Sequence, residues 1–442
     1  MAPITRRTAL GGALAIPAAA ALARTAQAAD ATEIDLFFPV PVQGMLANEM
    51  KKLIDRFNSE HGDIAVTAVY TGSYDDTNLK TRAAIKAGRP PAAVIMSANF
   101  VREYVINQEI DPFDPLIEKE GQTPAAYMDG FWAALKPNAV IDSRVYGIPF
   151  QNSTPLLYYN VEAFKDAGLD PDHPPVTWAD WINAAKALTK PGGERSGLMF
   201  PGTYDYCGWI TSGLVMANGG QYFNHDYGGE VYYNSPSALG ALMLLDKLVN
   251  QLKVVPPGVS DANACTSAFF SGRTGMMVLS TGSLSFVRDN MKAPYRVALL
   301  PRNVRNAAPI GGASLILPKG NSPARQAAAW TLISWLTSPE IAGRWSRFTG
   351  YFAPRRAAYD LPEMKQYLQE HPDAKVALDQ LVHAVPWFDT YNTVAVRKAM
   401  EDQVQAILSG KTSPAEATAS AQKSADELLR PYVERTALQP LG

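Results

Sequence analysis

Short apolar runs alternate with amphipathic stretches in the first part of the chain. The apolar runs cover residues 34–40, 64–70 and 92–97, and each has the length and composition of a buried strand. Between them, residues 45–57 and 75–88 repeat apolar positions at helical spacing. This strand–helix order predicts an α/β fold with a parallel sheet covered by helices on both faces.

The strand ends in this region are where a ligand is expected. In open α/β sheets, ligands bind beyond the carboxyl ends of the parallel strands. The segments that follow the three predicted strands are residues 39–43, 70–74 and 97–99.

A second set of alternating elements begins near residue 146. Residues 154–160 (TPLLYYN) read as a strand, and Thr177 with Asp180 has the spacing of a capping box that starts a helix. Residues 311–318 (GGASLILP) read as another strand, and residues 323–348 as a pair of helices. The closing region is helical, with Ser413 as the cap of its last helix. Length and pattern together favour two α/β domains.

The stretch RFTGYFAPRR, residues 347–356, contains an unexplained tyrosine. Gly350 suits a left-handed helix end, and Pro354 prevents the helix from resuming. Neither role explains why Tyr351 follows Gly350 directly. Its hydroxyl must face solvent, core or ligand, and the local pattern does not decide among them.

The N-terminal segment is typical of an exported protein. Arg6 and Arg7 precede an Ala/Leu run and the small-x-small sequence Ala26-Gln27-Ala28. We predict a twin-arginine-like signal peptide, residues 1–28, cleaved after Ala28, and a periplasmic mature protein. The full chain carries a net charge of −2, and losing a leader that contains arginines makes the remainder more acidic. That balance argues against a nucleic-acid partner, which requires a basic surface.

Histidines and cysteines indicate neither a metal site nor a catalytic one. The five histidines are scattered without metal-ligand spacing, and no Gly-x-Ser-x-Gly elbow joins a strand to a helix. We therefore predict no metal, no cofactor, no catalytic residue and no enzymatic activity. Cys207 and Cys265 form either one disulfide or two buried free thiols.

Four segments in fixed order resemble a known family. They are YGIP at residues 146–149, residues 156–181, GGASLILP at residues 311–318, and residues 335–354. Together they resemble the solute-binding proteins of ABC importers, of the larger carbohydrate-type class. Within this class, NSTPLLYYN, STGSL, IGGAS and TGYFAPRRAAYD are most similar to the members that bind sn-glycerol-3-phosphate in the periplasm.

The resemblance implies a two-lobed periplasmic binding protein of type II, the Venus flytrap fold, with hinge segments between discontinuous lobes. We place the N-terminal lobe at residues 29–145 and about 305–352, and the C-terminal lobe at residues 146–304 and about 353–442. It also implies a monomer that delivers its solute to ABC permease subunits in the inner membrane.

The resemblance also implies contacts to the solute. Matching positions are Tyr74, Ser153, Ser280, Gly312, Tyr351 and Arg397. Hydroxyl groups and a guanidinium are donors that suit a phosphate ester, and glycine allows a close backbone approach. Arg397 could instead pair with Glu401, one helical turn further along.

The sequence departs from the family where the glycerol hydroxyls are expected to bind. After the third strand the relatives have a carboxylate, and this chain has Ala98 or Asn99. Asn99, Tyr206 and Trp209 are further candidates for ligand contact, and the two aromatic residues could equally be core. We therefore predict capture of sn-glycerol-3-phosphate or a glycerophosphodiester in the inter-lobe cleft. A neutral sugar or oligosaccharide is the alternative.

Overall fold

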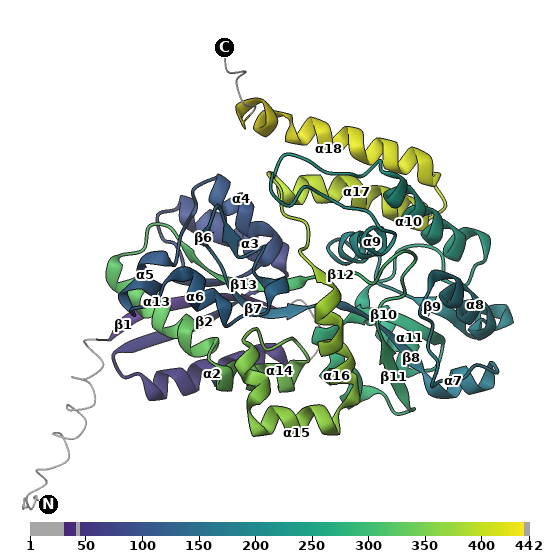
Figure 1. The fold of residues 1–442 in the computed structure, drawn as a ribbon, viewed down its shortest axis with the longest axis horizontal. Helices are drawn as coiled ribbons and strands as arrows, with labels where there is room; N and C mark the ends of the chain where they lie inside the picture. Colours follow the sequence, from purple (N-terminus) through teal and green to yellow (C-terminus); the bar gives the residue numbers. More distant parts are fainter. Residues whose placement is uncertain (1–30, 41–44, 437–442) are drawn as a thin grey trace, which may run out of the picture.

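The chain folds into two α/β lobes that face each other (Figure 1). The computed structural model describes residues 31–40 and 45–436, so the predicted signal peptide lies outside the described residues. In Figure 1 the first lobe, with β1 and β2, lies on the left, and the second lobe, with β8 and β11, lies on the right. No helix of the described residues is long and apolar enough to cross a membrane.

The first lobe is built on a six-stranded sheet with the order β2-β1-β3-β13-β4, and β7 pairs with β13. β1 runs parallel to β2 and β3, whereas β13 runs antiparallel to β3, β4 and β7. Its strands are β1 (Thr32–Pro39), β2 (Ile64–Gly72), β3 (Ala93–Ser97), β4 (Ile110–Asp111), β7 (Ile148–Ser153) and β13 (Gly311–Pro318). Its helices are α2 (Leu46–Glu60), α3 (Tyr74–Lys86), α4 (Val101–Ile106), α5 (Asp114–Lys119), α6 (Pro124–Asp129), α13 (Pro323–Leu336) and α14 (Pro339–Thr349). A small hairpin of β5 (Val140–Ile141) and β6 (Arg144–Val145) lies beside them.

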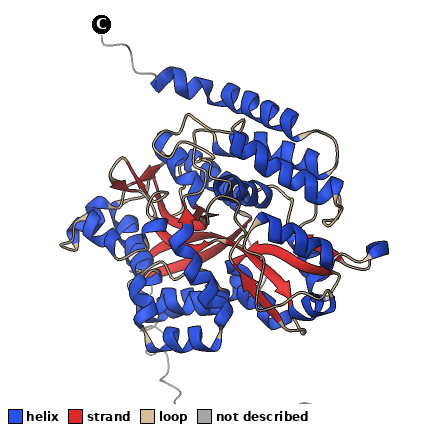
Figure 2. Ribbon diagram, turned by 45° about the vertical axis from the view of Figure 1, so that its right-hand side comes forward, coloured by secondary structure: helices blue, strands red, loops and turns tan. Residues whose placement is uncertain are grey.

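The second lobe is built on a four-stranded sheet with the order β11-β8-β10-β9. β10 runs antiparallel to β8 and parallel to β9. Its strands are β8 (Pro155–Asn160), β9 (Ser196–Met199), β10 (Thr274–Ser280) and β11 (Tyr295–Ala298). Its helices are α7 (Val161–Asp166), α8 (Trp178–Leu188), α9 (Tyr206–Ala217), α10 (Pro236–Asp246), α11 (Ala262–Phe270), α12 (Leu284–Asn290), α17 (Thr393–Leu408) and α18 (Pro414–Thr436). Figure 2 shows helices packed around both sheets.

Three passages of the chain connect the lobes. Thr154 separates β7 of the first sheet from β8 of the second. β12 (Ala308–Pro309), which pairs in parallel with β14 (Ala384–Val385), leads directly into β13. The third passage runs from the end of α14 through α15 (Pro362–Glu370) and α16 (Pro372–Asp379).

The strand pairing moves the predicted lobe boundary. We placed the second lobe from residue 146 onward, but β7 is hydrogen-bonded to β13 in the first sheet. The first crossing therefore falls at Thr154. The segment after residue 353 also begins on the first lobe, because Ala353 and Met364 pack in one cluster with Ala342 of α14.

Local signals in the sequence set several element ends as predicted. Thr177 and Asp180 form the capping box that starts α8, and Ser413 with Glu416 forms the same bonds at the start of α18. Gly350 ends α14 with a φ of 100°, as a left-handed cap requires. Cys207 and Cys265 are both buried free thiols, so of the two alternatives the free thiols are correct and the disulfide is not.

Candidate ligand-binding site

A pocket lies between the two lobes and encloses about 390 Å³ of space that no atoms fill. Part of that space is open to solvent. The lining residues come from the ends of elements in both lobes. They are Tyr74, Ser97, Ser153, Asp205, Tyr206, Trp209, Ser280, Gly311, Gly312, Tyr351 and Trp387.

Strand ends bring the small polar residues of the pocket together. Ser97 ends β3, Ser153 ends β7 and Ser280 ends β10. The hydroxyl of Ser280 also accepts a hydrogen bond from the Gly282 N–H at 3.0 Å, which fixes the turn after β10. Of these three serines, Ser97 lies in one of the segments that the strand pattern indicated for ligand binding.

Gly312 is required by its backbone conformation and by space. It has a φ of 83°, and a Cβ at this position would lie 2.1 Å from the carbonyl oxygen of Gln151. Only glycine fits here without moving the β7–β13 pairing. The backbone can therefore border the pocket directly.

Two buried tyrosines from the first lobe face the pocket. Tyr351, which follows the αL cap of α14, is 1% exposed, and Tyr74 begins α3. Gln151 Nε2 donates a hydrogen bond to the Tyr74 hydroxyl at 3.1 Å. Burial raises the pKa of both phenols well above the ordinary value, so both remain neutral and can donate hydrogen bonds.

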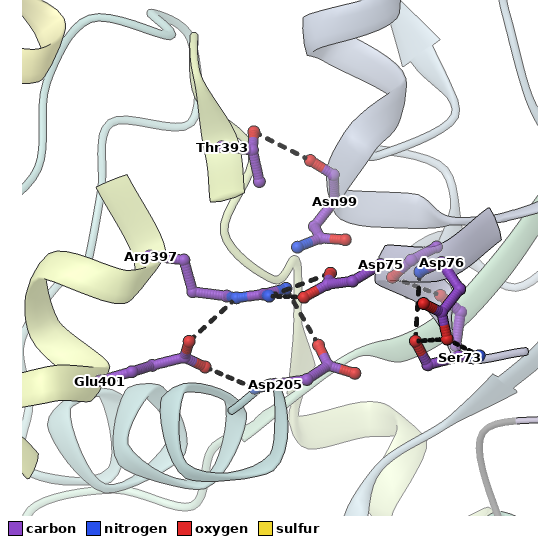
Figure 3. A network of polar contacts seen from close by, with 10 residues as sticks. Ser73, Asp75, Asp76, Asn99, Asp205, Thr393, Arg397 and Glu401 are labelled. Carbon is purple, nitrogen blue, oxygen red and sulfur yellow. Dashed lines mark hydrogen bonds and ion pairs between the residues drawn. The ribbon is translucent and has the colours of Figure 1, made fainter. Parts of the chain in front are cut away.

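Arg397 belongs to α17 and does not line the pocket. It lies behind Asp205, which does. Its side chain is 1% exposed, and all three of its nitrogens contact carboxylates (Figure 3). Nη2 donates to both oxygens of Asp75 at 2.8 and 3.0 Å, and Nη1 donates to Asp205 at 3.1 Å. Nε donates to Glu401 at 3.3 Å, which is the pairing that the sequence left open. The donors that we expected for a phosphate are thus engaged by protein carboxylates.

The charges around Arg397 do not balance. Burial raises the pKa of Asp205 to about 6 and that of Glu401 to about 7, although the guanidinium of Arg397 opposes both shifts. Repulsion from a neighbouring carboxylate adds to each shift, because one guanidinium cannot neutralise three carboxylates. The pKa of Arg397 itself is held above its ordinary value by these carboxylates, so it stays charged.

The further candidates divide into two groups. Tyr206 and Trp209 line the pocket from the first turn of α9, and the Trp209 Nε1 donates to the Pro309 carbonyl at 3.1 Å. Asn99 lies outside the pocket, in a short 3-10 turn that buries it completely. Neither polar atom of its side chain has a hydrogen-bond partner among the described residues. Ala98, the other residue at that position, is buried as well.

Several lining residues were missed by the sequence reasoning. Ser97, Asp205, Gly311 and Trp387 were not named as contacts. Ser97 had a usable signal, because it follows the third strand within a segment that the strand pattern had already indicated. Asp205 has a φ of 74°, an unusual conformation for a residue other than glycine that no sequence pattern reveals. Among the described residues, no group of histidine, cysteine and acidic side chains could hold a metal ion.

Comparisons with known proteins agree on one family. The family model described as bacterial extracellular solute-binding protein matches residues 52–376. The chain is 29% identical to the sn-glycerol-3-phosphate-binding periplasmic protein UgpB of Pectobacterium atrosepticum, over 98% of this chain and 99% of that protein. It is 28% identical to the protein of the same name from Escherichia coli K12, over 89% of this chain and 92% of the relative.

Solved structures show the same fold. UgpB from Mycobacterium tuberculosis in complex with glycerophosphocholine matches with a TM-score of 0.81 at 24% identity, covering 91% of this chain and all of that one. A solute-binding protein from Thermotoga lettingae, bound with α-D-tagatose, matches with a TM-score of 0.77 at 22% identity, covering 90% of this chain and all of that one. Both identities are low, so these two structures establish the two-lobed fold alone.

Proposed function

The chain belongs to the bacterial extracellular solute-binding proteins, and from that premise we propose that it captures sn-glycerol-3-phosphate or a glycerophosphodiester between its lobes. Proteins of this kind bind a solute for an ABC importer, and the chain is a binding protein rather than an enzyme. The solute passes from the closed lobes to the permease subunits of the importer. The proposed function requires no cofactor.

The proposal depends chiefly on where five expected contact residues lie. Tyr74, Ser153, Ser280, Gly312 and Tyr351 are far apart in the sequence, and all five line one pocket between the lobes. Four of them carry hydroxyl groups, which can donate to phosphate oxygens. Relatives that match nearly the full chain are named for binding glycerol-3-phosphate.

In this proposal Arg397 binds the phosphate group of the solute, which replaces the carboxylate of Asp75. In the structure, one guanidinium nitrogen, Nη2, donates to both carboxylate oxygens of Asp75, and a phosphate oxygen is suited to take the place of that carboxylate. Asp75 comes from α3 of the first lobe and its side chain is 39% exposed, whereas Arg397 is anchored in the second lobe. When the lobes separate, Asp75 can return to water at little cost and leave the donors of Arg397 to the solute.

A neutral sugar is the second candidate, and one observation favours it. The pocket carries the rings of Tyr206, Trp209 and Trp387, and no lysine or arginine is among its lining residues. Aromatic faces with hydroxyl groups suit a neutral polyol as well as a phosphorylated one.

Thermal unfolding with three solutes separates the two candidates. A solute at a hundred times its dissociation constant stabilises the folded state by about 2.7 kcal/mol, which raises the melting temperature measurably. We expect sn-glycerol-3-phosphate or glycerophosphocholine to raise it, and maltose to leave it unchanged. A shift with maltose and none with either phosphate ester would establish the sugar alternative.

We also propose that the protein acts in the periplasm after cleavage behind Ala28. Relatives that match nearly the full chain are named as periplasmic proteins. Mass spectrometry of the protein recovered from the periplasm tests this, because the mature chain should begin at Ala29. Recovery of the uncleaved chain would contradict the proposed site.

A further inference from the structure

One carboxylate of the pocket is left free to bind a solute. Asp205 is the only acidic residue that lines the pocket among the described residues. Its Oδ1 receives the bond from Arg397, while its Oδ2 accepts no hydrogen bond from any described residue. The side chain is 32% exposed and lines the pocket between the lobes.

The backbone holds Asp205 firmly in this orientation. Its N–H donates to Glu401 Oε1 at 2.7 Å, and its carbonyl accepts from the Trp209 N–H at 3.1 Å (Figure 3 shows the bond to Glu401). The residue has a φ of 74° and a ψ of −56°, a conformation that costs free energy for any side chain except glycine. Strain of this kind persists where the surrounding structure fixes it, and it is concentrated at functional sites.

The other polar groups of the pocket leave a role for a charged acceptor. The serine and tyrosine hydroxyls can donate to phosphate oxygens, but the alcohol groups of a polyol also need acceptors for their own protons. The expected carboxylate after the third strand is missing, because Ala98 is apolar and Asn99 is not among the residues that line the pocket. Asp205 presents a carboxylate to the same pocket from the second lobe.

We propose that Asp205 is a specificity-determining residue whose Oδ2 accepts hydrogen bonds from the alcohol hydroxyls of the solute. It replaces, from the opposite lobe, the acceptor that the third strand does not provide. The inference rests on the proposed function, because it assumes a phosphorylated polyol. In this proposal Asp205 binds the alcohol hydroxyls of the solute, and the neighbouring Arg397 binds its phosphate group.

Calorimetric titration with two esters tests this role. sn-Glycerol-3-phosphate carries two hydroxyls, and propyl phosphate carries none but presents the same phosphate. The ratio of their dissociation constants therefore isolates the hydroxyl contacts from the charge near Arg397. A hydrogen bond to a charged acceptor corresponds to roughly a tenfold to hundredfold difference in affinity.

Two variants of Asp205 and one matched control complete the design. Asp205→Gly removes the carboxylate and suits the positive φ, so the fold is retained, which the ligand-free melting temperature verifies. Asp205→Asn keeps the shape and removes the charge. Asp402→Asn is the control, because this exposed carboxylate contacts Tyr204 and lies outside the pocket.

The expected result is a loss of selectivity. Both Asp205 variants should reduce the preference for sn-glycerol-3-phosphate over propyl phosphate by about tenfold or more, and Asp402→Asn should not. If the wild type binds both esters and the ratio stays within about twofold in Asp205→Gly, the role of Asp205 is wrong while the proposed function stands. If the wild type binds none of sn-glycerol-3-phosphate, propyl phosphate and glycerophosphocholine, the proposed function is wrong, and the inference falls with it.

Discussion

At the scale of single residues, the buried guanidinium of Arg397 determines the charge balance beside the pocket. It is shared by Asp75, Asp205 and Glu401, so its contribution to the folded state is separate from any role in binding. Sequence reasoning had to choose between a phosphate contact and an ion pair. In the structure the ion pairs are present, and the phosphate contact stays a prediction.

Arg397→Ala is therefore expected to destabilise the protein even without a solute. Removing one partner of a buried ion pair leaves desolvated charges unpaired and costs about 3 to 5 kcal/mol. Chemical denaturation of the ligand-free protein measures this loss, with Lys423→Ala on the exposed face of α18 as the control. An unchanged free energy of unfolding in Arg397→Ala would contradict the buried network.

A second residue-scale prediction concerns the backbone at Gly312. Gly312→Ala adds a Cβ that would clash with the Gln151 carbonyl, so we expect a loss of about 3 kcal/mol or more. Gly88→Ala is the matched control, because Gly88 also has a positive φ but no atom lies within 4 Å of the added Cβ. The control should lose only about 1 kcal/mol. Equal losses in the two variants would show that the close approach at Gly312 has no energetic weight.

At the scale of elements, a buried carboxylate links the segment before α17 to the first lobe. Asp389 lies 3.2 Å from Arg102 Nε of α4, and Asn138 Nδ2 donates to it at 3.0 Å. Burial raises the pKa of Asp389 to about 7, against the opposing charge of Arg102. The contact joins elements far apart in sequence. Because the pKa of Asp389 is raised, the contribution of this contact to stability depends on pH in a predictable direction.

Asp389→Asn is expected to become the more stable form as the pH rises. The folded-state pKa lies above the ordinary value of 3.8, so the folded protein holds a proton that the unfolded chain has lost. The contribution of Asp389 to wild-type stability therefore falls as the pH rises from about 4 to about 7, and asparagine cannot ionise. Melting temperatures at pH 5.0, 6.0, 7.0 and 7.5 should show the variant gaining on the wild type, whereas a constant difference would contradict the raised pKa.

The elements also show how far the sequence alone can lead. The strands and helices around residues 34–97 were predictable, because burial on a sheet and helical spacing leave a regular apolar pattern. The membership of β7 in the first sheet was not, because the predicted boundary at residue 146 ignored its pairing with β13. The orientation of Asn99 and Asp205 was equally hidden, because side-chain direction and a φ of 74° are decided by packing between distant segments.

At the scale of the whole molecule, the pocket exists only where the two lobes meet. Tyr74 and Tyr351 come from the first lobe, and Ser280 and Trp209 from the second. The ion pair between Asp75 of α3 and Arg397 of α17 crosses the same gap. A solute that contacts both lobes stabilises the closed arrangement by its differential affinity for that state.

The most direct test of this account is small-angle X-ray scattering on the wild-type protein, with and without a saturating solute. The solute is whichever ester calorimetry shows to bind. Closure of two lobes over a solute predicts a smaller radius of gyration in the saturated sample than in the ligand-free one. An unchanged radius of gyration with an ester that demonstrably binds would contradict capture between the lobes.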